Sequence, residues 1–263
     1  MLTPRRQSLK TLGIALAAAS TAAISNTAVS TAAAPADTLE PAGASTLQAL
    51  TKHLAALPHR RDFKTVPMIL DHRDQWDAEA LDAVFHYAGG PKQAWNNTDL
   101  HGPWLNVMRN SMNSEIWSFR HPDFLCASAT HGPAQLALYD DAMWDKYGLA
   151  KLAGGNVTRN SFVAAPPAVA HDPKDYQNPK GAFSAAANSI QALQQRGAVF
   201  LACHNAVWEL TAHLIATNNN PDKLTNEAMC AEFSNHLIPD VVLTPGAVGT
   251  LAELGRSGFS YAQ

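Results

Sequence analysis

The chain has 263 residues, a formal net charge of −3 and 46% hydrophobic residues. The chain is thus nearly neutral, and its sequence has neither the basic stripe expected of a nucleic-acid-binding protein nor a polybasic patch that would bind membranes. Three cysteines are too few for a disulfide scaffold, and their odd number leaves at least one thiol unpaired within a monomer.

Residues 1–36 have the features of a twin-arginine export signal. Arg5–Arg6 precede an alanine- and leucine-rich stretch over 12–23, and Ala34–Ala36 offers a small-x-small cleavage site. Ser8 stands where such signals usually carry phenylalanine. A membrane anchor is the alternative, but the apolar stretch is shorter than the roughly 20 residues that a span needs. We therefore expect a periplasmic or otherwise exported protein.

The remaining chain divides into an arm and one domain. Residues 37–62 read as a linker with a short helix over 46–56, and residues 63–263 read as a single α/β domain. Apolar runs and amphipathic spacing then predict elements in the following order: strand 66–70, helix 77–88, helix 104–114, strand 124–129, helix 134–152, helix 182–196, strand 199–202, helix 206–217, helix 226–235, strand 241–244, helix 246–256 and strand 259–262.

This alternation predicts a three-layer, doubly wound α/β fold with a mostly parallel sheet and helices on both faces. Gly89–Pro91 reads as a turn, which places Trp95 in a loop beside a candidate pocket. The segment 154–181 is rich in Asn, Pro and Gly, and loops of this length are commonly functional lids or poorly ordered.

Three predicted strands each end in a polar cluster that contains a histidine. These clusters are Asp71–His72, Thr130–His131 and Cys203–Asn205. The carboxyl ends of parallel strands lie at one edge of the sheet, where open α/β folds place their ligands. We therefore expect the functional site at this edge, with Cys203 as its most reactive group.

Four motifs in order resemble the DsrE/DsrF-like family, which is related to the sulfur-relay proteins of tRNA thiolation. They are the His131–Pro133 turn after a strand, the Gly-x-x-Phe-x-x-Cys-x-Asn pattern over Gly197–Asn205, and the tail segments 237–246 and 254–261. The resemblance covers about residues 66 to 263. It implies a three-layer α/β fold, frequent homo-oligomers and a cysteine that accepts sulfane sulfur as a persulfide.

Cys203 matches the cysteine of the family's Cys-x-Asn strand end. The chain departs from the mostly cytoplasmic relay members by its export signal, so the sulfur donor or acceptor, a protein or a small thiol, cannot be carried over. Trp95–Thr98 and Trp104–Asn110 suggest a separate exported branch. No membrane partner is expected after signal cleavage.

We assign the expected roles as follows. Cys203 is the sulfur acceptor, because a thiolate can attack a sulfane sulfur and a helix N-terminus or a protonated histidine favours the thiolate. His131 and His204 would tune the thiol or shuttle protons. The residues expected to bind ligand are His72, Asn205, Trp95 and Arg109. Whether the chain turns over as a sulfurtransferase or only carries sulfur stays open.

Three alternatives remain. In the first, Cys203 is a buried structural thiol, as is common for free cysteine. A non-enzymatic protein of the same fold would bind a small ligand, or copper or zinc through His72, His131 and Cys203. A structural or partner-binding subunit is the third. No cofactor is expected, and hydrolase chemistry is disfavoured because Gly-x-Ser-x-Gly and a glycine-rich phosphate loop are absent.

Overall fold

The computed structural model describes residues 39–163 and 173–263. The expected export signal and part of the segment 154–181 lie outside the described residues. No helix in the described ranges has the length and apolar character needed to cross a membrane.

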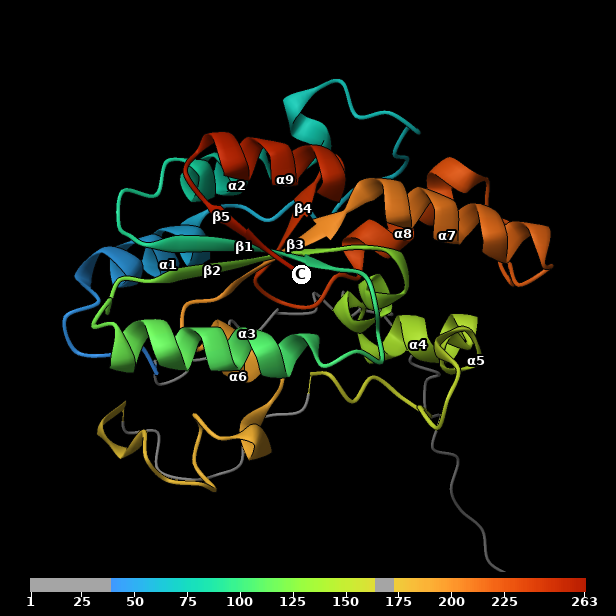
Figure 1. The fold of residues 1–263 in the computed structure, drawn as a ribbon. Helices are drawn as coiled ribbons and strands as arrows, with labels where there is room; N and C mark the ends of the chain where they lie inside the picture. The colour runs from blue at the N-terminus through green and yellow to red at the C-terminus, as the bar shows by residue number, and fades with distance from the viewer. Residues whose placement is uncertain (1–38, 164–172) are drawn as a thin grey trace, which may run out of the picture. The chain divides into compact units, whose positions relative to one another are not determined.

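The described residues contain one parallel sheet in the order β4-β3-β2-β1-β5 (Figure 1). Its strands are β1 (Lys92–Asn97), β2 (Leu125–Thr130), β3 (Val199–Cys203), β4 (Val241–Thr244) and β5 (Ser260–Ala262). Helices cover both faces of this sheet, so the expected three-layer α/β fold with a parallel sheet is confirmed.

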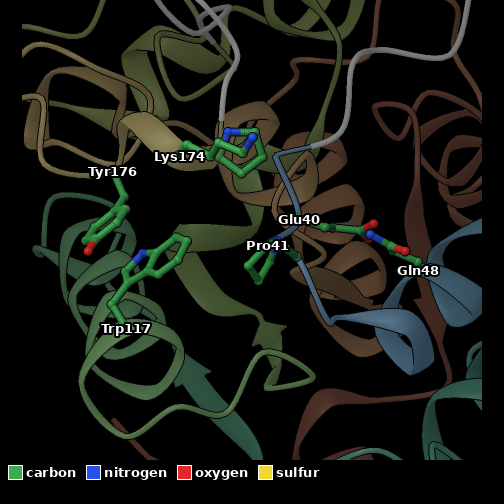
Figure 2. Close-up of a pocket in the computed structure, with 8 residues that line it drawn as sticks. Glu40, Pro41, Gln48, Trp117, Lys174 and Tyr176 are labelled. Carbon is green, nitrogen blue, oxygen red and sulfur yellow. The ribbon is translucent and has the colours of Figure 1, made fainter.

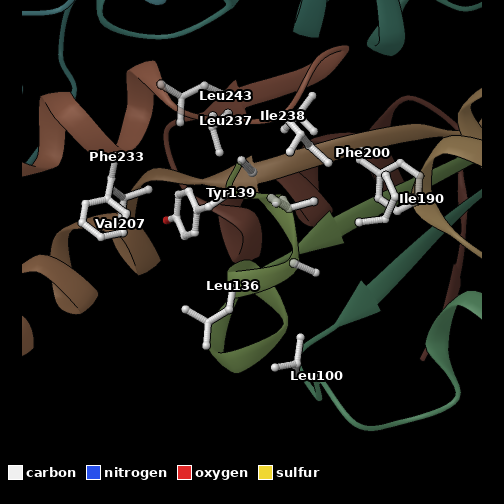
Figure 3. Close-up of a cluster of buried hydrophobic side chains, with 14 of the residues drawn as sticks. Leu100, Leu136, Tyr139, Ile190, Phe200, Val207, Phe233, Leu237, Ile238 and Leu243 are labelled. Atoms are coloured by element: carbon white, nitrogen blue, oxygen red, sulfur yellow. The ribbon is translucent and has the colours of Figure 1, made fainter. Parts of the chain in front are cut away.

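The α-helices of the described residues are α1 (Ser45–Ala56), α2 (Ala78–Phe85), α3 (Trp104–Asn113), α4 (Asp141–Tyr147), α5 (Leu149–Ala153), α6 (Ile190–Gln194), α7 (His204–Ala216), α8 (Asn226–Asn235) and α9 (Ala247–Arg256). Buried side chains of α1, α2 and α9 pack on one face of the sheet. Those of α3 to α8 form the larger core on the other face, where Phe200 of β3 lies beside Ile190 of α6, and Val207 of α7 lies beside Phe233 of α8 (Figure 3).

The path of the chain places a topological switch between β3 and β4. From β1 to β4, each strand lies beside the one before it, and the connecting helices α3 to α8 stay on one face. After β4, α9 packs on the opposite face and returns the chain to β5 beside β1. The connections that leave β3 and β4 therefore diverge to opposite faces, and this is the position at which open α/β sheets ordinarily bind ligands.

The first strand lies elsewhere than expected. Val66–Leu70 forms no strand, and Met68 and Ile69 are exposed, so the prediction from this apolar run was wrong. The sheet instead begins with β1, whose sequence Lys-Gln-Ala-Trp-Asn-Asn is too polar to read as a buried strand. Trp95 is consequently a buried strand residue and not a loop residue, which corrects the expectation above.

Two expected helices are broken into shorter pieces. The segment 134–152 contains a 3-10 helix over Gly132–Leu138, then α4 and α5, with Gly148 at a φ of 57° between them. The segment 182–196 contains a 3-10 turn over Ala185–Ala187 and the short helix α6. Ser189 begins α6, because its hydroxyl accepts a hydrogen bond from the Ala192 N–H at 3.2 Å.

Gly197 joins α6 to β3 with a φ of +87°, and a Cβ atom there would lie 2.7 Å from Cδ2 of Leu47 in α1. We expect Gly197→Ala to lower the free energy of unfolding by about 2–4 kcal/mol, through backbone strain and overpacking. Gly249→Ala is the matched control, because a Cβ at this exposed position of α9 meets nothing within 4 Å. That change should stabilise the protein by about 0.5–1 kcal/mol in urea unfolding. Equal effects of the two changes would contradict the argument.

Candidate functional site

Cys203 lies at the carboxyl end of β3, at the switch point between β3 and β4. It is the N-cap residue of α7, and its Sγ accepts a hydrogen bond from the Ala206 N–H at 3.4 Å. The same Sγ accepts a second bond from the N–H of Ala247, the first residue of α9, at 3.2 Å. The sulfur is thus held by the N-termini of two helices that leave on opposite faces of the sheet.

This geometry favours negative charge on the sulfur. Each helix N-terminus carries unsatisfied N–H groups and a partial positive charge of about half an elementary charge. Both α7 and α9 direct such a group at the Cys203 sulfur, whereas an ordinary structural thiol has an apolar surrounding on all sides. Two backbone N–H groups are therefore in place to bond negative charge that develops on the sulfur during a reaction.

Three alanines and one leucine pack around Cys203. Cys203 is 4% exposed and packs against Ala129 of β2 and Ala247 of α9, and Ala206 and Leu251 pack against this cluster. The backbone of Gly246 comes close to Asn205, because a Cβ there would lie 2.8 Å from the Asn205 Nδ2. Asn205, which the sequence predicts to bind ligand, is exposed and follows Cys203 by two positions.

Gln135 fixes the end of β3, although nothing in the sequence marks it as a site residue. Its Oε1 accepts a hydrogen bond from the Cys203 N–H at 3.0 Å, and its side chain is buried. Its Nε2 donates to the hydroxyl of Tyr139 at 3.4 Å. This buried link ties the strand end that carries Cys203 to the segment that follows β2.

His131 follows β2 and faces the end of β1. Its Nε2 donates to Oδ1 of Asn96 at 2.7 Å, while Nδ2 of Asn96 donates to the hydroxyl of Tyr261 at 3.0 Å. Burial lowers the pKa of His131, and the nearby carboxylate of Glu209 partly opposes that shift. The imidazole is therefore biased towards its neutral form at the same sheet edge that carries Cys203.

His204 is buried, and its two ring nitrogens bond to groups other than Cys203. Nε2 donates to the backbone oxygen of Met68 at 3.1 Å, and Nδ1 lies 3.7 Å from Sγ of Cys230. Burial lowers the pKa of His204, and the hydrogen bonds to Met68 and Pro67 partly oppose this. These contacts attach the extended segment around Met68 to α7.

The lowered pKa values of His131 and His204 predict acid sensitivity. The unfolded chain, with a histidine pKa near 6.5, binds these protons at a higher pH than the folded chain does. Stability should therefore fall as the pH drops below about 6.5 towards the lower pKa of the folded state. We measure the free energy of unfolding in urea at pH 7 and at pH 5. Between these two pH values, we expect the free energy of unfolding to fall less for His204→Gln than for wild type. His72→Gln, a change of an exposed ring, is the control; an unchanged loss in His204→Gln would contradict the prediction.

The other expected ligand-binding residues lie away from Cys203. The side chain of His72 is 75% exposed beside Asp71, on a segment that is not a strand. Trp95 packs in the core on the α3 face, whereas Cys203 contacts α9. Arg109 on α3 donates to the backbone oxygen of Phe183 at 3.0 Å. Reasoning from strand ends failed for His72 because the strand before it does not form.

The metal-binding set expected as an alternative is not assembled. Within residues 39–163 and 173–263, no group of three or more His, Cys, Asp or Glu side chains is placed to hold a metal ion. His72, His131 and Cys203 therefore do not converge. The three cysteines are all unpaired and buried.

A cavity of about 430 Å³ lies apart from this sheet edge (Figure 2). Trp117 and Tyr176 stack on one side of it, with ring centroids 4.2 Å apart. Neither Cys203 nor His131 lines the cavity, so the cavity is separate from the candidate site at Cys203.

No protein-family model matches this sequence, and no curated protein or solved structure shows significant similarity to it. The resemblance to DsrE-like proteins therefore rests on the motif residues alone.

Proposed function

We propose that this chain is an exported DsrE-like protein that carries or transfers sulfane sulfur through Cys203. The observation that carries the proposal is the position of the Cys203 sulfur between the N–H groups of Ala206 and Ala247, at the switch point of a parallel sheet. Export through residues 1–36, a homo-oligomeric state and a sulfur-donating or sulfur-accepting partner are parts of the proposal that rest on the sequence.

The proposed chemistry is a thiolate exchange without net oxidation. The Cys203 thiolate attacks the outer sulfur of a donor persulfide, R–S–SH. A new S–S bond forms on Cys203, the S–S bond of the donor breaks, and R–S⁻ leaves with the electron pair. The proton stays on the transferred sulfur. Reversal of this step on an acceptor thiolate delivers the sulfur and regenerates Cys203.

The surroundings of Cys203 suit such a persulfide. Ala129, Ala206 and Ala247 contribute short side chains beside Cys203, and Leu251 is a larger side chain packed against the same cluster. The outer sulfur of a persulfide is also anionic near neutral pH, and the same two helix N-termini would favour that charge. His131, biased towards its neutral form, is the better placed of the two histidines to accept a proton at this edge.

The test is intact mass of the exported, reduced protein after incubation with glutathione persulfide. We expect a gain of about 32 Da that dithiothreitol reverses, as thiolate exchange requires. Peptide mapping after alkylation should place the added sulfur on the peptide that contains Cys203. No gain, or a gain found only at Cys126 or Cys230, would rule out the proposed role of Cys203.

A partner-binding role is the second candidate, and one observation favours it. Val248 in the first turn of α9 is 71% exposed, directly beside Ala247, whose N–H contacts the Cys203 sulfur. An apolar side chain at this position suits a partner surface that docks over the switch point. Equal binding of the cellular partner by wild type and by Cys203→Ser would favour this candidate.

A further inference from the structure

Arg196 is a buried cation without an anionic partner. It follows α6 and is 1% exposed. Its Nη2 donates to Oδ1 of Asn113 at 2.7 Å, and its guanidinium carbon lies 4.9 Å from the centre of the Phe183 ring. Its Nε and Nη1 are both buried and have no hydrogen-bond partner. Two donors of a guanidinium are thus left unused in the interior.

A second guanidinium, that of Arg109 on α3, interacts electrostatically with the first. Its Nη1 donates to the backbone oxygen of Phe183 at 3.0 Å, and its Nη2 donates to the amide oxygens of Asn106 and Asn110. Its Nε is also buried without a partner. All of these acceptors are neutral, and no ion pair in the described ranges involves either arginine.

Electrostatics makes this arrangement unfavourable as it stands. Burial, followed by repulsion from Arg109, lowers the pKa of Arg196 to about 9. Buried charges in proteins are ordinarily paired or bound to a counter-ion, because an unpaired charge loses its hydration without compensation. The same holds for buried N–H donors, which nearly always have a partner. A bound anion would supply both the missing charge and the missing acceptors.

We propose that Arg109 and Arg196 form a binding site for a small oxyanion, which is a carboxylate, phosphate or sulfate group. The free Nε and Nη1 of Arg196 lie on different sides of its guanidinium, so one of them would donate to an oxygen of the anion, and the free Nε of Arg109 would donate to another oxygen. Hydrogen bonds between a charged guanidinium and an oxyanion are stronger than those between neutral groups. The site is separate from Cys203 and does not depend on the sulfur chemistry proposed above.

The cavity of Figure 2 is connected to Arg196 by a chain of two aromatic contacts. Trp117 of the cavity wall packs edge-on against Phe183, with ring centroids 5.9 Å apart, and the Phe183 ring also faces the guanidinium of Arg196.

The experiment is a calorimetric titration of the full exported chain with sodium sulfate, sodium phosphate and sodium acetate, at constant ionic strength. We expect saturable binding of at least one of them, and the three arms distinguish carboxylate from phosphate or sulfate. Arg109→Gln should weaken that binding by about tenfold or more, because it removes a hydrogen bond from a charged donor. The matched control is Arg256→Gln, a change of an exposed residue of α9 that pairs with Glu253.

Arg196→Met tests the second guanidinium, and a selenate soak of wild-type crystals covers the case in which this variant does not fold. An anomalous peak within hydrogen-bond distance of Arg196 is expected. Absence of saturable binding by wild type, equal affinities of Arg109→Gln and Arg256→Gln, or water alone beside Arg196 in the soaked crystal would each overturn the proposal.

Discussion

Replacement of Cys203 by serine is expected to abolish the gain of about 32 Da that a persulfide donor produces, because a hydroxyl oxygen cannot take part in thiolate exchange. Serine is nearly isosteric with cysteine, and its oxygen can accept hydrogen bonds from the same Ala206 and Ala247 N–H groups. The fold should therefore persist, which a urea unfolding curve close to that of wild type would show. Intact mass before and after treatment with the donor measures the effect.

The other two cysteines provide the matched controls. Burial raises the pKa of Cys126 and that of Cys230 to about 12, so almost none of either thiol is ionised near neutral pH. Cys126→Ala and Cys230→Ala should each keep the full reductant-sensitive mass gain. A loss of the gain in Cys230→Ala would mean that the sulfur acceptor is the thiol beside His204, and the assignment to Cys203 would then be wrong.

The region around Cys203 was predictable because its local patterns agree with one another. Val199–Ala202 is a continuous apolar run, as a strand covered on both faces requires, and a polar cluster follows it directly. Pro245–Gly246 similarly marks the end of β4 and the start of α9. In both places the residue types, the burial and the change of element all predict the same boundary.

Elsewhere the residue pattern misled because burial did not follow hydrophobicity. Met68 and Ile69 are exposed, and the Met68 carbonyl attaches their segment to His204. These two apolar side chains therefore do not belong to a buried strand. In β1, by contrast, buried Asn97 is compatible with a strand because its Nδ2 donates to the hydroxyl of Ser128 at 2.7 Å. No local sequence pattern predicts a buried polar residue whose hydrogen-bond partner lies 31 positions away.

The decisive part of the candidate site is also non-local. The second hydrogen bond to the Cys203 sulfur comes from the backbone of Ala247, 44 positions along the chain. Almost every residue has a backbone N–H, so the sequence does not mark this donor. Only the arrangement of β3, β4 and α9 in the folded chain reveals it. The pair formed by Arg109 and Arg196 was hidden for the same reason, since α3 and α6 become neighbours only in the folded chain.

Asp77, directly before α2, closes the free edge of β4. Its Oδ2 accepts a hydrogen bond from the Leu243 N–H at 2.7 Å, and its own N–H donates to the Leu243 oxygen at 3.1 Å. Arg61 pairs with the Asp77 carboxylate and donates through Nη2 to the oxygen of Val241 at 2.7 Å. Exposed strand edges are templates for pairing with other chains, and this ion pair occupies the hydrogen-bonding groups that would allow it.

Asp77→Ala is expected to lower the free energy of unfolding by about 3–5 kcal/mol, because it removes one partner of a buried ion pair. The Asp77 side chain is 0% exposed, so its loss leaves the Arg61 guanidinium without its counter-ion and the Leu243 N–H without its acceptor. Urea unfolding followed by tryptophan fluorescence measures the change. We also expect concentration-dependent association in light scattering, since the edge of β4 becomes free.

Asp82→Ala is the matched control, because Asp82 pairs with Arg73 on the surface, where such pairs contribute about 0–1 kcal/mol. A loss below about 1 kcal/mol for Asp77→Ala would contradict the assigned role. The same variant links the fold to the proposed chemistry. β4 leads directly into Ala247, so a loosened strand would displace the N–H that holds the Cys203 sulfur. Folded Asp77→Ala protein should therefore take up sulfur more slowly than Asp82→Ala protein does, although both retain Cys203.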